Sequence, residues 1–461
     1  MKPPHYALEV PTDFRRRLAA GWLALALGAL LVSGFFAVLL VLARAPGSRA
    51  LFPGADFFQV ALVVHVNLSV LVWFTGCAGL FWSLAGSARG EAAGWLALVL
   101  AATGSLILAA APFIGRGAPV MANYVPVVDE PMFLSGLLVF AAGAALLVLR
   151  AMVAVSPVGV RMDGAGALRF GLNAAAVSAA VALIAFAWSW SEVPRALDPR
   201  AYYEILFWGG GHVLQFTWTL LLFVAWLWGA EVCGARIPLS PRVATLLFGI
   251  ALAAVFVTPV IYLAWDVTSI EHRRWHTWLM RFGGGLAILP FAAALAWALA
   301  RAGAPTPQAR PVRAALVASL VLFGAGGAIG VGIGASNVTV PAHYHGSIVG
   351  VTLAFMALVY CLLPALGYAA PVSRAAAWQP WLYGGGQLAH VLGLFWSGGY
   401  GIPRKVAGAA QVLRTPEETL AMALMGAGGL VAVAGGMLFL VIVLRAVARA
   451  PTQPPMREAR A

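Results

Sequence analysis

His343 and His345 stand two residues apart at the head of an apolar stretch that ends near Pro364. On an α-helix this spacing turns the second side chain by about 200° from the first. Two side chains on opposite sides of a helix cannot easily share one metal ion, because helical neighbours lie three or four residues apart. Each imidazole can instead serve its own flat cofactor, or both can face water at a helix end.

Other histidines also lie in or beside long apolar runs. His65 lies in VVHVNLSVLVW, His212 follows three glycines in WGGGHVLQF, and His390 lies in QLAHVLGL. An ionisable side chain inside a membrane span suggests a functional site, with a histidine satisfied by the helix packing as the alternative. The glycines before His212 would let a flat ligand approach the backbone, unless they only serve helix packing. His272 and His276 fall around a loop between two runs.

The elements that must position these histidines are membrane helices. Of the 461 residues, 62% are hydrophobic and 10% charged, which excludes a soluble globular protein. The net charge of +13 does not indicate a nucleic-acid partner, because loop arginines that orient membrane spans explain it. Cys77, Cys233 and Cys361 lie far apart without CxxC spacing, so neither a disulfide framework nor a thiolate metal site is expected.

We predict an all-α, polytopic membrane protein with twelve transmembrane helices, because runs long enough to cross about 30 Å of hydrocarbon recur along the chain. The distribution of Lys and Arg places both termini in the cytoplasm. Residues 1–450 are expected to form one membrane domain, followed by a disordered cytoplasmic tail at 451–461. The glycine-rich segment 324–334 is interpreted as a close helix contact. The predicted spans are 18–43, 57–85, 93–114, 131–154, 169–190, 203–231, 243–265, 275–300, 312–334, 342–368, 377–397 and 418–448.

At these positions the chain resembles subunit I of the haem–copper oxidase superfamily, above all the branch of the C-type cytochrome oxidases and nitric oxide reductases. Segment 65–73 resembles the second-span haem-ligand motif, and 343–346 with LVYCLLP downstream resembles the tenth-span histidine pair. Gly211-His212 resembles the sixth-span segment that carries a metal ligand. Segments 390–394 and 401–405 resemble the end of the eleventh span. The resemblance covers nearly the whole chain and implies a bacterial-type inner membrane.

The resemblance implies two haems, of b-type. His65 and His345 would be ligands of the low-spin haem, and His343 would be the axial ligand of the high-spin haem. His212 would face a second, non-haem metal, copper or iron. The catalytic residues implied in this way are His343 and His212.

Further residues and partners are implied by the same resemblance. Arg404 and Lys405 would pair with haem propionates, as a charge-assisted contact. The substrate would be O2 or NO, and the electron donor cytochrome c or quinol. The sequence has no CxxCH site, so any haem c would belong to an accessory subunit.

The chain departs from the family at the metal site. The family's seventh span carries two adjacent histidines, whereas the matching stretch 262–271 has none. A single imidazole is a poor copper site, so Asp266, Glu271 or Gln215 could supply oxygen ligands that suit iron better, or the second metal could be absent. We place His272 in the next loop, too late to serve.

Two other features of the family are missing. Oxygen-reducing members carry a tyrosine near the metal, but Phe216 stands four residues after His212, and Tyr262 is the only tyrosine of the seventh span. Acidic residues within the spans are scarce, so no proton relay can be traced.

Three functions are therefore weighed. The first, which the resemblance favours, is a respiratory oxidoreductase core subunit that passes electrons from a low-spin to a high-spin haem and reduces O2 to water or NO to N2O. The second is a haem-based gas-binding or electron-transfer protein without the non-haem metal, which the missing histidine pair favours. The third is a transporter; twelve spans fit it, but no internal repeat is evident and the histidine placement would be coincidence.

Overall fold

The structure is a computed structural model that describes residues 5–44, 57–114, 117–159, 162–334, 336–404 and 413–449. Within these ranges the elements are helices, apart from one antiparallel hairpin of two short strands, β1 (Ala118–Val120) and β2 (Val127–Asp129). The predicted all-α class is thus confirmed. The segment 451–461 lies outside the described residues.

Eleven helical stretches among the described residues are long and apolar enough to cross a membrane. The remaining predicted span corresponds to α14 (Arg374–Gly399), a helix of 26 residues in which glycines and glutamines interrupt the apolar sequence. The predicted twelve-helix membrane fold is therefore confirmed, and the protein is an integral membrane protein.

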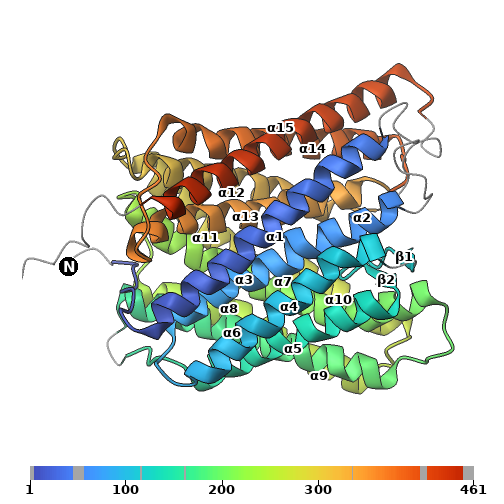
Figure 1. Cartoon of the computed structure of the whole chain (residues 1–461), viewed down its shortest axis with the longest axis horizontal. Coiled ribbons are helices and arrows are strands. Elements are labelled where there is room, and N and C mark those ends of the chain that lie inside the picture. Colours follow the sequence, from blue (N-terminus) through green and yellow to red (C-terminus); the bar gives the residue numbers. More distant parts are fainter. Residues whose placement is uncertain are drawn as a thin grey trace, which may run out of the picture. The chain divides into compact units, whose positions relative to one another are not determined.

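The chain divides into two compact units. The larger unit comprises residues 11–224 and 239–291, and the smaller unit comprises residues 1–10, 225–238 and 292–461. The elements of the larger unit, all but η2 labelled in Figure 1, are α1 (Phe14–Arg44), α2 (Phe57–Val66), η2 (Asn67–Val72), α3 (Trp73–Ala85), α4 (Glu91–Ile114), β1, β2, α5 (Pro131–Val153), α6 (Gly164–Glu192), most of α7 (Pro199–Val232), α8 (Pro241–Val255), α9 (Val257–Ala264) and α10 (Ile270–Gly283).

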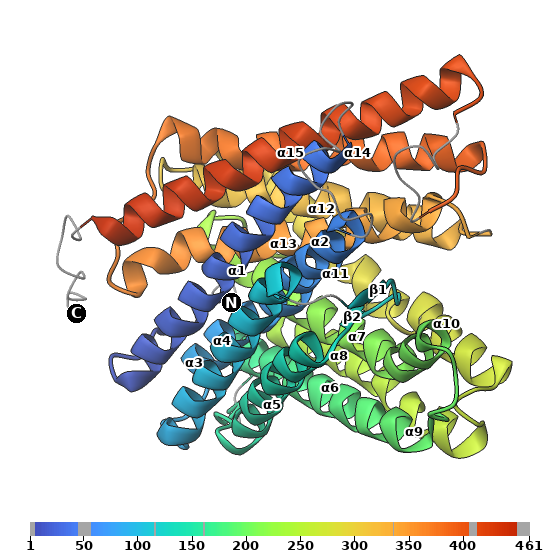
Figure 2. The ribbon, with the colours of Figure 1, turned by 45° about the vertical axis from the view of Figure 1, so that its right-hand side comes forward.

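The smaller unit consists mainly of four long helices. They are α12 (Arg310–Val331), α13 (Thr339–Ala365), α14 and α15 (Pro416–Ala448), together with most of α11 (Gly285–Arg301). α14 and α15 run side by side in both views (Figures 1 and 2). Glycines permit this approach: a Cβ on Gly386 or Gly428 would meet backbone atoms of the neighbouring helix.

The glycine-rich segment 324–334 contributes to helix packing at some of its positions. A Cβ on Gly326 would meet the backbone at Ser347, and a Cβ on Gly346 would lie 2.7 Å from the Gly326 Cα. α12 and α13 therefore touch through two glycines at this point, as interpreted from the sequence. Gly324 and Gly327 instead face open space.

The second span is one continuous helical stretch with a widened turn. α2 passes into the π-helical segment η2, which passes into α3. Asn67 opens this segment and donates its side-chain amide to the Val63 carbonyl at 2.9 Å and the Pro126 carbonyl at 2.7 Å. The widened turn thus fastens the helix that carries His65 to the β1–β2 hairpin.

The eighth span begins earlier than predicted. We expected a start at residue 275, whereas α10 begins at Ile270. Ser269 caps it, because its side chain accepts a hydrogen bond from the His272 amide at 3.1 Å. The cap moves His272 and His276 out of the expected loop and into a helix.

Candidate functional site

His212 lies on α7 with 4% of its surface exposed. Its Nδ1 donates to the Trp208 carbonyl at 2.8 Å, one turn earlier on the same helix. Its Nε2 therefore carries the lone pair and accepts a hydrogen bond from the Tyr124 hydroxyl at 3.0 Å. Both ring nitrogens of this imidazole are engaged.

The three glycines before His212 make room for aromatic rings of the protein. A Cβ on Gly209 would collide with Tyr262, one on Gly210 with Phe186, and one on Gly211 with Tyr124. The expectation that this turn exposes its backbone to a flat ligand is therefore wrong, since protein rings already fill the space.

His272 and His276 lie one turn apart on α10, both fully buried. Their ring centroids are 4.5 Å apart, and that of His276 is 6.0 Å from His212. His276 Nδ1 donates to the His272 carbonyl at 2.9 Å. Neither ring nitrogen of His272 has a hydrogen-bond partner, nor does Nε2 of His276. We call His212, His272 and His276 the three-histidine cluster.

The sequence placed His272 too late to join His212, and the structure corrects this. The available signal was the spacing of four between His272 and His276, which puts both on one helix face, together with the capping residue Ser269. The polar residues between Asp266 and Ser269 interrupt the apolar sequence, and this stretch was therefore read as part of a longer loop.

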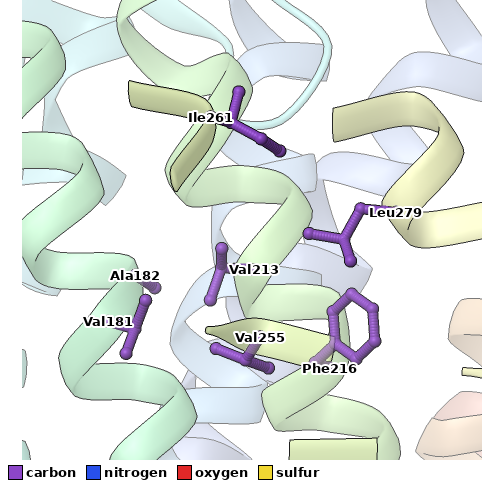
Figure 3. Close-up of a cluster of buried hydrophobic side chains, with 7 residues drawn as sticks. All are labelled: Val181, Ala182, Val213, Phe216, Val255, Ile261 and Leu279. Atoms are coloured by element: carbon purple, nitrogen blue, oxygen red, sulfur yellow. The ribbon is translucent and has the colours of Figure 1, made fainter. Parts of the chain in front are cut away.

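The two tyrosine positions raised by the sequence differ in role. Phe216 packs in an apolar core with Val213, Leu279 and four other residues of α6, α8 and α9 (Figure 3). The Tyr262 ring lies against the cluster, 4.7 Å from His272 and 5.6 Å from His276 between centroids. Its hydroxyl lies 2.7 Å from the Ser189 hydroxyl and donates to the Ala185 carbonyl at 3.0 Å.

The acidic side chains of the stretch 262–271 are exposed to solvent. Asp266 is exposed, and hydrogen bonds from the Thr268 hydroxyl and amide hold the pKa of its carboxyl below the usual value. Glu271 is also exposed, and Gln215 lies beside Tyr124. Across the described part of the chain, no three or more His, Cys, Asp or Glu side chains are placed to hold a metal ion.

Tyr124 comes from the loop of the β1–β2 hairpin, where sequence analysis had no signal for it. Asn123 binds the Glu204 carboxylate through its amide and its side chain, and Tyr203 donates to Asp129 at 3.1 Å. These contacts, which we call the hairpin clasp, fix the hairpin to the start of α7. Burial and the Glu204 charge raise the pKa of Tyr124, so its hydroxyl stays protonated and donates to His212.

In the smaller unit, His343 and His345 are half-buried and contact different helices. His343 Nδ1 donates to the Gly326 carbonyl of α12 at 2.7 Å. The His345 ring lies 4.8 Å from the His390 ring of α14, and His390 Nδ1 donates to the Met425 carbonyl of α15 at 2.9 Å. The structure thus groups His345 with His390.

His65 lies in the larger unit, half-buried, at the end of α2. Its Nδ1 donates to the Ser33 carbonyl of α1 at 2.9 Å. Arg404 lies close enough to Tyr344 to influence it electrostatically. Lys405 lies outside the described residues.

One arrangement recurs among these side chains. In the described ranges, His65, His212, His276, His343 and His390 each donate Nδ1 to a backbone carbonyl. Metal-binding histidines are oriented in this way, with Nε2 left for the metal. The half-buried residues His65 and His343 fit haem ligation, because the Nε2 atom of each makes no hydrogen bond within the described residues.

The family model for cytochrome c and quinol oxidase polypeptide I matches residues 17–438. The chain belongs to the haem–copper oxidase subunit I family. A solved structure described as a heme-copper terminal oxidase dimer matches this subunit I fold with a TM-score of 0.75, over 96% of this chain and 86% of the other, at 18% identity.

Two curated relatives of this subunit I chain are described only as uncharacterized proteins. One, from Rickettsia prowazekii (strain Madrid E), is 25% identical over 494 aligned residues, which cover 92% of this chain and 95% of the relative. The other, from Aquifex aeolicus (strain VF5), is 28% identical over 352 aligned residues, which cover 75% of this chain and 85% of the relative. Family membership makes the chain a membrane protein of respiratory oxidase type.

Proposed function

We propose that this chain is the core subunit of a respiratory oxidoreductase that reduces a small gas, O2 or NO. Two b-type haems, when bound, would supply electron transfer and gas binding. The observation that carries the proposal is the repeated orientation of membrane histidines, with Nδ1 given to a carbonyl and Nε2 available for a metal.

The roles of individual residues are taken from the family motifs. By these motifs, His65 and His345 would hold the low-spin haem, and His343 would hold the high-spin haem. The carbonyls of Ser33 and Gly326 fix the rings of His65 and His343, so each Nε2 has a defined direction. Arg404 and Lys405 pair with propionates.

The three-histidine cluster is the candidate for the second metal. Its imidazoles are the donors that copper, iron or zinc accepts. Its arrangement does not fit a metal as it stands, because His212 Nε2 is engaged with Tyr124. We therefore route no chemical step through a second metal.

That mismatch supports a second candidate function, a haem protein that binds gas or transfers electrons without a non-haem metal. The two functions share the haem ligands and differ in whether the gas is turned over.

The setting proposed for the chain is the same in both cases. It lies in a bacterial-type inner membrane with cytoplasmic termini, with residues 1–450 as the subunit I domain and residues 451–461 as a tail. The electron donor is cytochrome c or quinol, and any haem c belongs to an accessory subunit.

The proposal is tested on purified protein by reduced-minus-oxidised and CO-difference spectra, an iron and copper count, and O2 and NO consumption. We expect two haems per chain and turnover of one gas. Two haems without turnover or a second metal would favour the gas-binding candidate, whereas a protein without haem would contradict both.

The low-spin assignment has its own test. His65→Ala should remove the low-spin signal and leave the high-spin haem, because only one of the two irons loses a ligand. Survival of both signals would show that the ligand assignment is wrong.

A further inference from the structure

Arg150 is a buried cation near the end of α5. Only 4% of its surface is exposed, and its Nε donates to the Gly90 carbonyl at 3.0 Å. Its Nη2 is buried without a hydrogen-bond partner, and no carboxylate within the described ranges forms an ion pair with it. A charge taken out of water is unfavourable unless an opposite charge or hydrogen bonds compensate for it. The guanidinium therefore lacks a counterion in the described part of the chain.

A second buried polar group lies in the loop that joins α3 to α4. Among the described residues, the Ser87 hydroxyl has no hydrogen-bond partner. The Ser87 amide donates to the Ala154 carbonyl, just past the end of α5, at 2.6 Å. The same loop accepts the hydrogen bond from Arg150 Nε at Gly90. Both contacts join the loop to the end of α5, so the two unpartnered groups belong to one place in the fold.

The start of α4 adds positive polarity to this place. The amides of a first helical turn have no acceptor within the helix, and Gly90, which precedes Glu91, has no side chain that could accept from them. A Cβ on Gly94 would lie 2.9 Å from Arg150 Nε, so the side chain of Arg150 lies against this turn. A cation beside a helix amino terminus is unfavourable, whereas an anion would be stabilised by both.

The neighbouring charged side chains are mostly basic. Arg15 donates to the Gly86 carbonyl at 2.6 Å and lies close enough to Arg150 for the two charges to repel each other. The carboxylate of Asp13 is already engaged, because both of its oxygens accept hydrogen bonds from Arg15. Two more arginines follow Arg15 in the sequence, and another lies in the loop. An anionic ligand would relieve this excess of positive charge.

Apolar side chains beside this place point out of the protein. Leu96 on α4 is 52% exposed, and Leu149 and Val153 on α5 are 60% and 68% exposed. In a membrane protein, such side chains face the acyl chains of lipids. A phospholipid joins a negatively charged phosphate to acyl chains, and basic pockets between membrane helices bind such head groups. It therefore matches both the charge and the apolar surface.

We infer that Arg150, Ser87 and the first turn of α4 form a binding site for a phosphate group. The guanidinium and the hydroxyl donate hydrogen bonds to the phosphate oxygens, and the amides at the start of α4 bind the same charge. An anionic phospholipid is the expected source of the phosphate, because its acyl chains would lie along α4 and α5. Free inorganic phosphate is the other source. The site is separate from the proposed haem ligands.

The experiment is native mass spectrometry of full-length, delipidated protein titrated in detergent with phosphatidylglycerol or with phosphatidylcholine. The first phosphatidylglycerol should bind about tenfold more tightly than the first phosphatidylcholine, whose choline group cancels the phosphate charge. A second titration contains millimolar inorganic phosphate. Phosphatidylglycerol that stays bound would assign the site to the lipid, whereas its displacement would support the site with free phosphate as the source.

Two variants test the residues of the site. Arg150→Gln and Ser87→Ala should each weaken the first phosphatidylglycerol step about tenfold, because each removes a hydrogen bond to a charged group. Ser105→Ala is the matched control for the serine, since this buried hydroxyl donates to a carbonyl of its own helix. Arg313→Gln controls for the loss of one positive charge, because its guanidinium donates to carbonyls at the end of α11. Both controls should change the affinity less than about twofold.

Ser87→Ala also distinguishes a binding site from a role in packing. If Ser87 only packs, or if water alone satisfies it, the variant would keep the wild-type affinity for phosphatidylglycerol, and the inference would be overturned. Equal binding of the two lipids to the wild type would also overturn it. If Arg150→Gln does not fold, the comparison of Ser87→Ala with Ser105→Ala still decides the question.

Discussion

The three-histidine cluster of the larger unit contrasts in burial and in bonding with the histidines of the smaller unit. In the larger unit, the three-histidine cluster is buried, with 4%, 0% and 0% of its residues' surfaces exposed, and three of its ring nitrogens are unpartnered. In the smaller unit, His343 and His390 are half-buried, and each donates Nδ1 to a carbonyl of a neighbouring helix.

The contrast bears on where a large planar ligand can bind. A half-buried imidazole that is fixed by a second helix leaves a ring edge for such a group. The packed imidazoles and aromatic rings of the three-histidine cluster leave none. Substitutions in the cluster should therefore spare the haems, whereas substitutions at His343 should disturb one of them.

The largest effect is expected at His343. His343→Ala should remove the high-spin haem and abolish gas turnover, because that iron would lose the axial imidazole proposed for it. Haem is counted by the pyridine haemochrome method. His5→Ala is the control: His5 bonds to Glu231 near the chain's start, and its loss should leave both haems in place. If His343→Ala kept two intact haems, His343 would not hold a haem, and the contrast between the two groups of histidines would no longer apply to ligand binding.

The next largest effects are expected for glycine substitutions beside the cluster and beside His343. Gly211→Ala pushes against the Tyr124 ring and should lower stability by about 1–3 kcal/mol without changing the haem spectra. Gly330→Ala, whose Cβ would lie 2.5 Å from His343 Nδ1, should shift the spectrum of the high-spin haem.

Gly249→Ala in α8 is the control for both, since nothing lies within 4 Å of its Cβ. Its free energy of unfolding should rise by about 0.5–1 kcal/mol, because alanine favours a helix more than glycine does. Thermal unfolding in detergent measures all three. The contrast would weaken if Gly211→Ala and Gly330→Ala altered the same spectral signal.

Within the cluster, the hydrogen-bonded His212 and the unpartnered His272 should respond differently to substitution. His212→Phe leaves the Tyr124 hydroxyl without its acceptor and should cost about 1–2 kcal/mol. His272→Phe removes two unpartnered nitrogens and should be neutral or slightly stabilising. Unfolding after chelation compares them. Equal losses would mean that His272 has a hydrogen-bond partner in solution.

The smallest effect concerns pH and the loop that leads into α10. The pKa of Asp266 is held below its ordinary value, so its bonds to Thr268 stabilise the fold above the unfolded-state pKa of about 3.9, and this contribution is lost as pH falls through the folded pKa. The loss should stay below about 1 kcal/mol because the group is exposed.

Amide exchange over residues 265–276, corrected for the intrinsic rate, measures this effect. Asp266→Asn should speed exchange there at pH 6 and remove its acid dependence. Asp13→Asn is the control, since Asp13 also has a lowered pKa but pairs with Arg15 in the first turn of α1. Faster exchange of this loop in Asp13→Asn would point to a global rather than a local effect.

Hydropathy sufficed to predict the membrane helices, because burial in hydrocarbon demands long apolar runs wherever the chain crosses. The least apolar of the twelve, α14, was still predicted, since its neighbours fixed the loops on either side. The sequence could not place the start of α10. One capping hydrogen bond at Ser269 decides that boundary, and hydropathy does not register it.

The candidate site was predicted in part. His212, His65 and the tenth-span pair stood out because histidines are conspicuous in apolar runs, and their ligand roles stay predictions. Tyr124 was missed because it lies in a loop, and only the hairpin pairing of Ala118 with Asp129 and the space over Gly211 bring it to His212. Contacts between a loop and a distant helix leave no local signal in the sequence.

The widened turn η2 has a consequence for comparing this chain with its relatives. A π-helical turn absorbs one extra residue, so the helix on either side keeps the facing it would have in a regular α-helix one residue shorter. A homologue with a single-position gap between Asn67 and Val72 would therefore point its second-span imidazole the same way from a regular helix. A homologue of equal length without the widened turn would rotate that imidazole by about 100°.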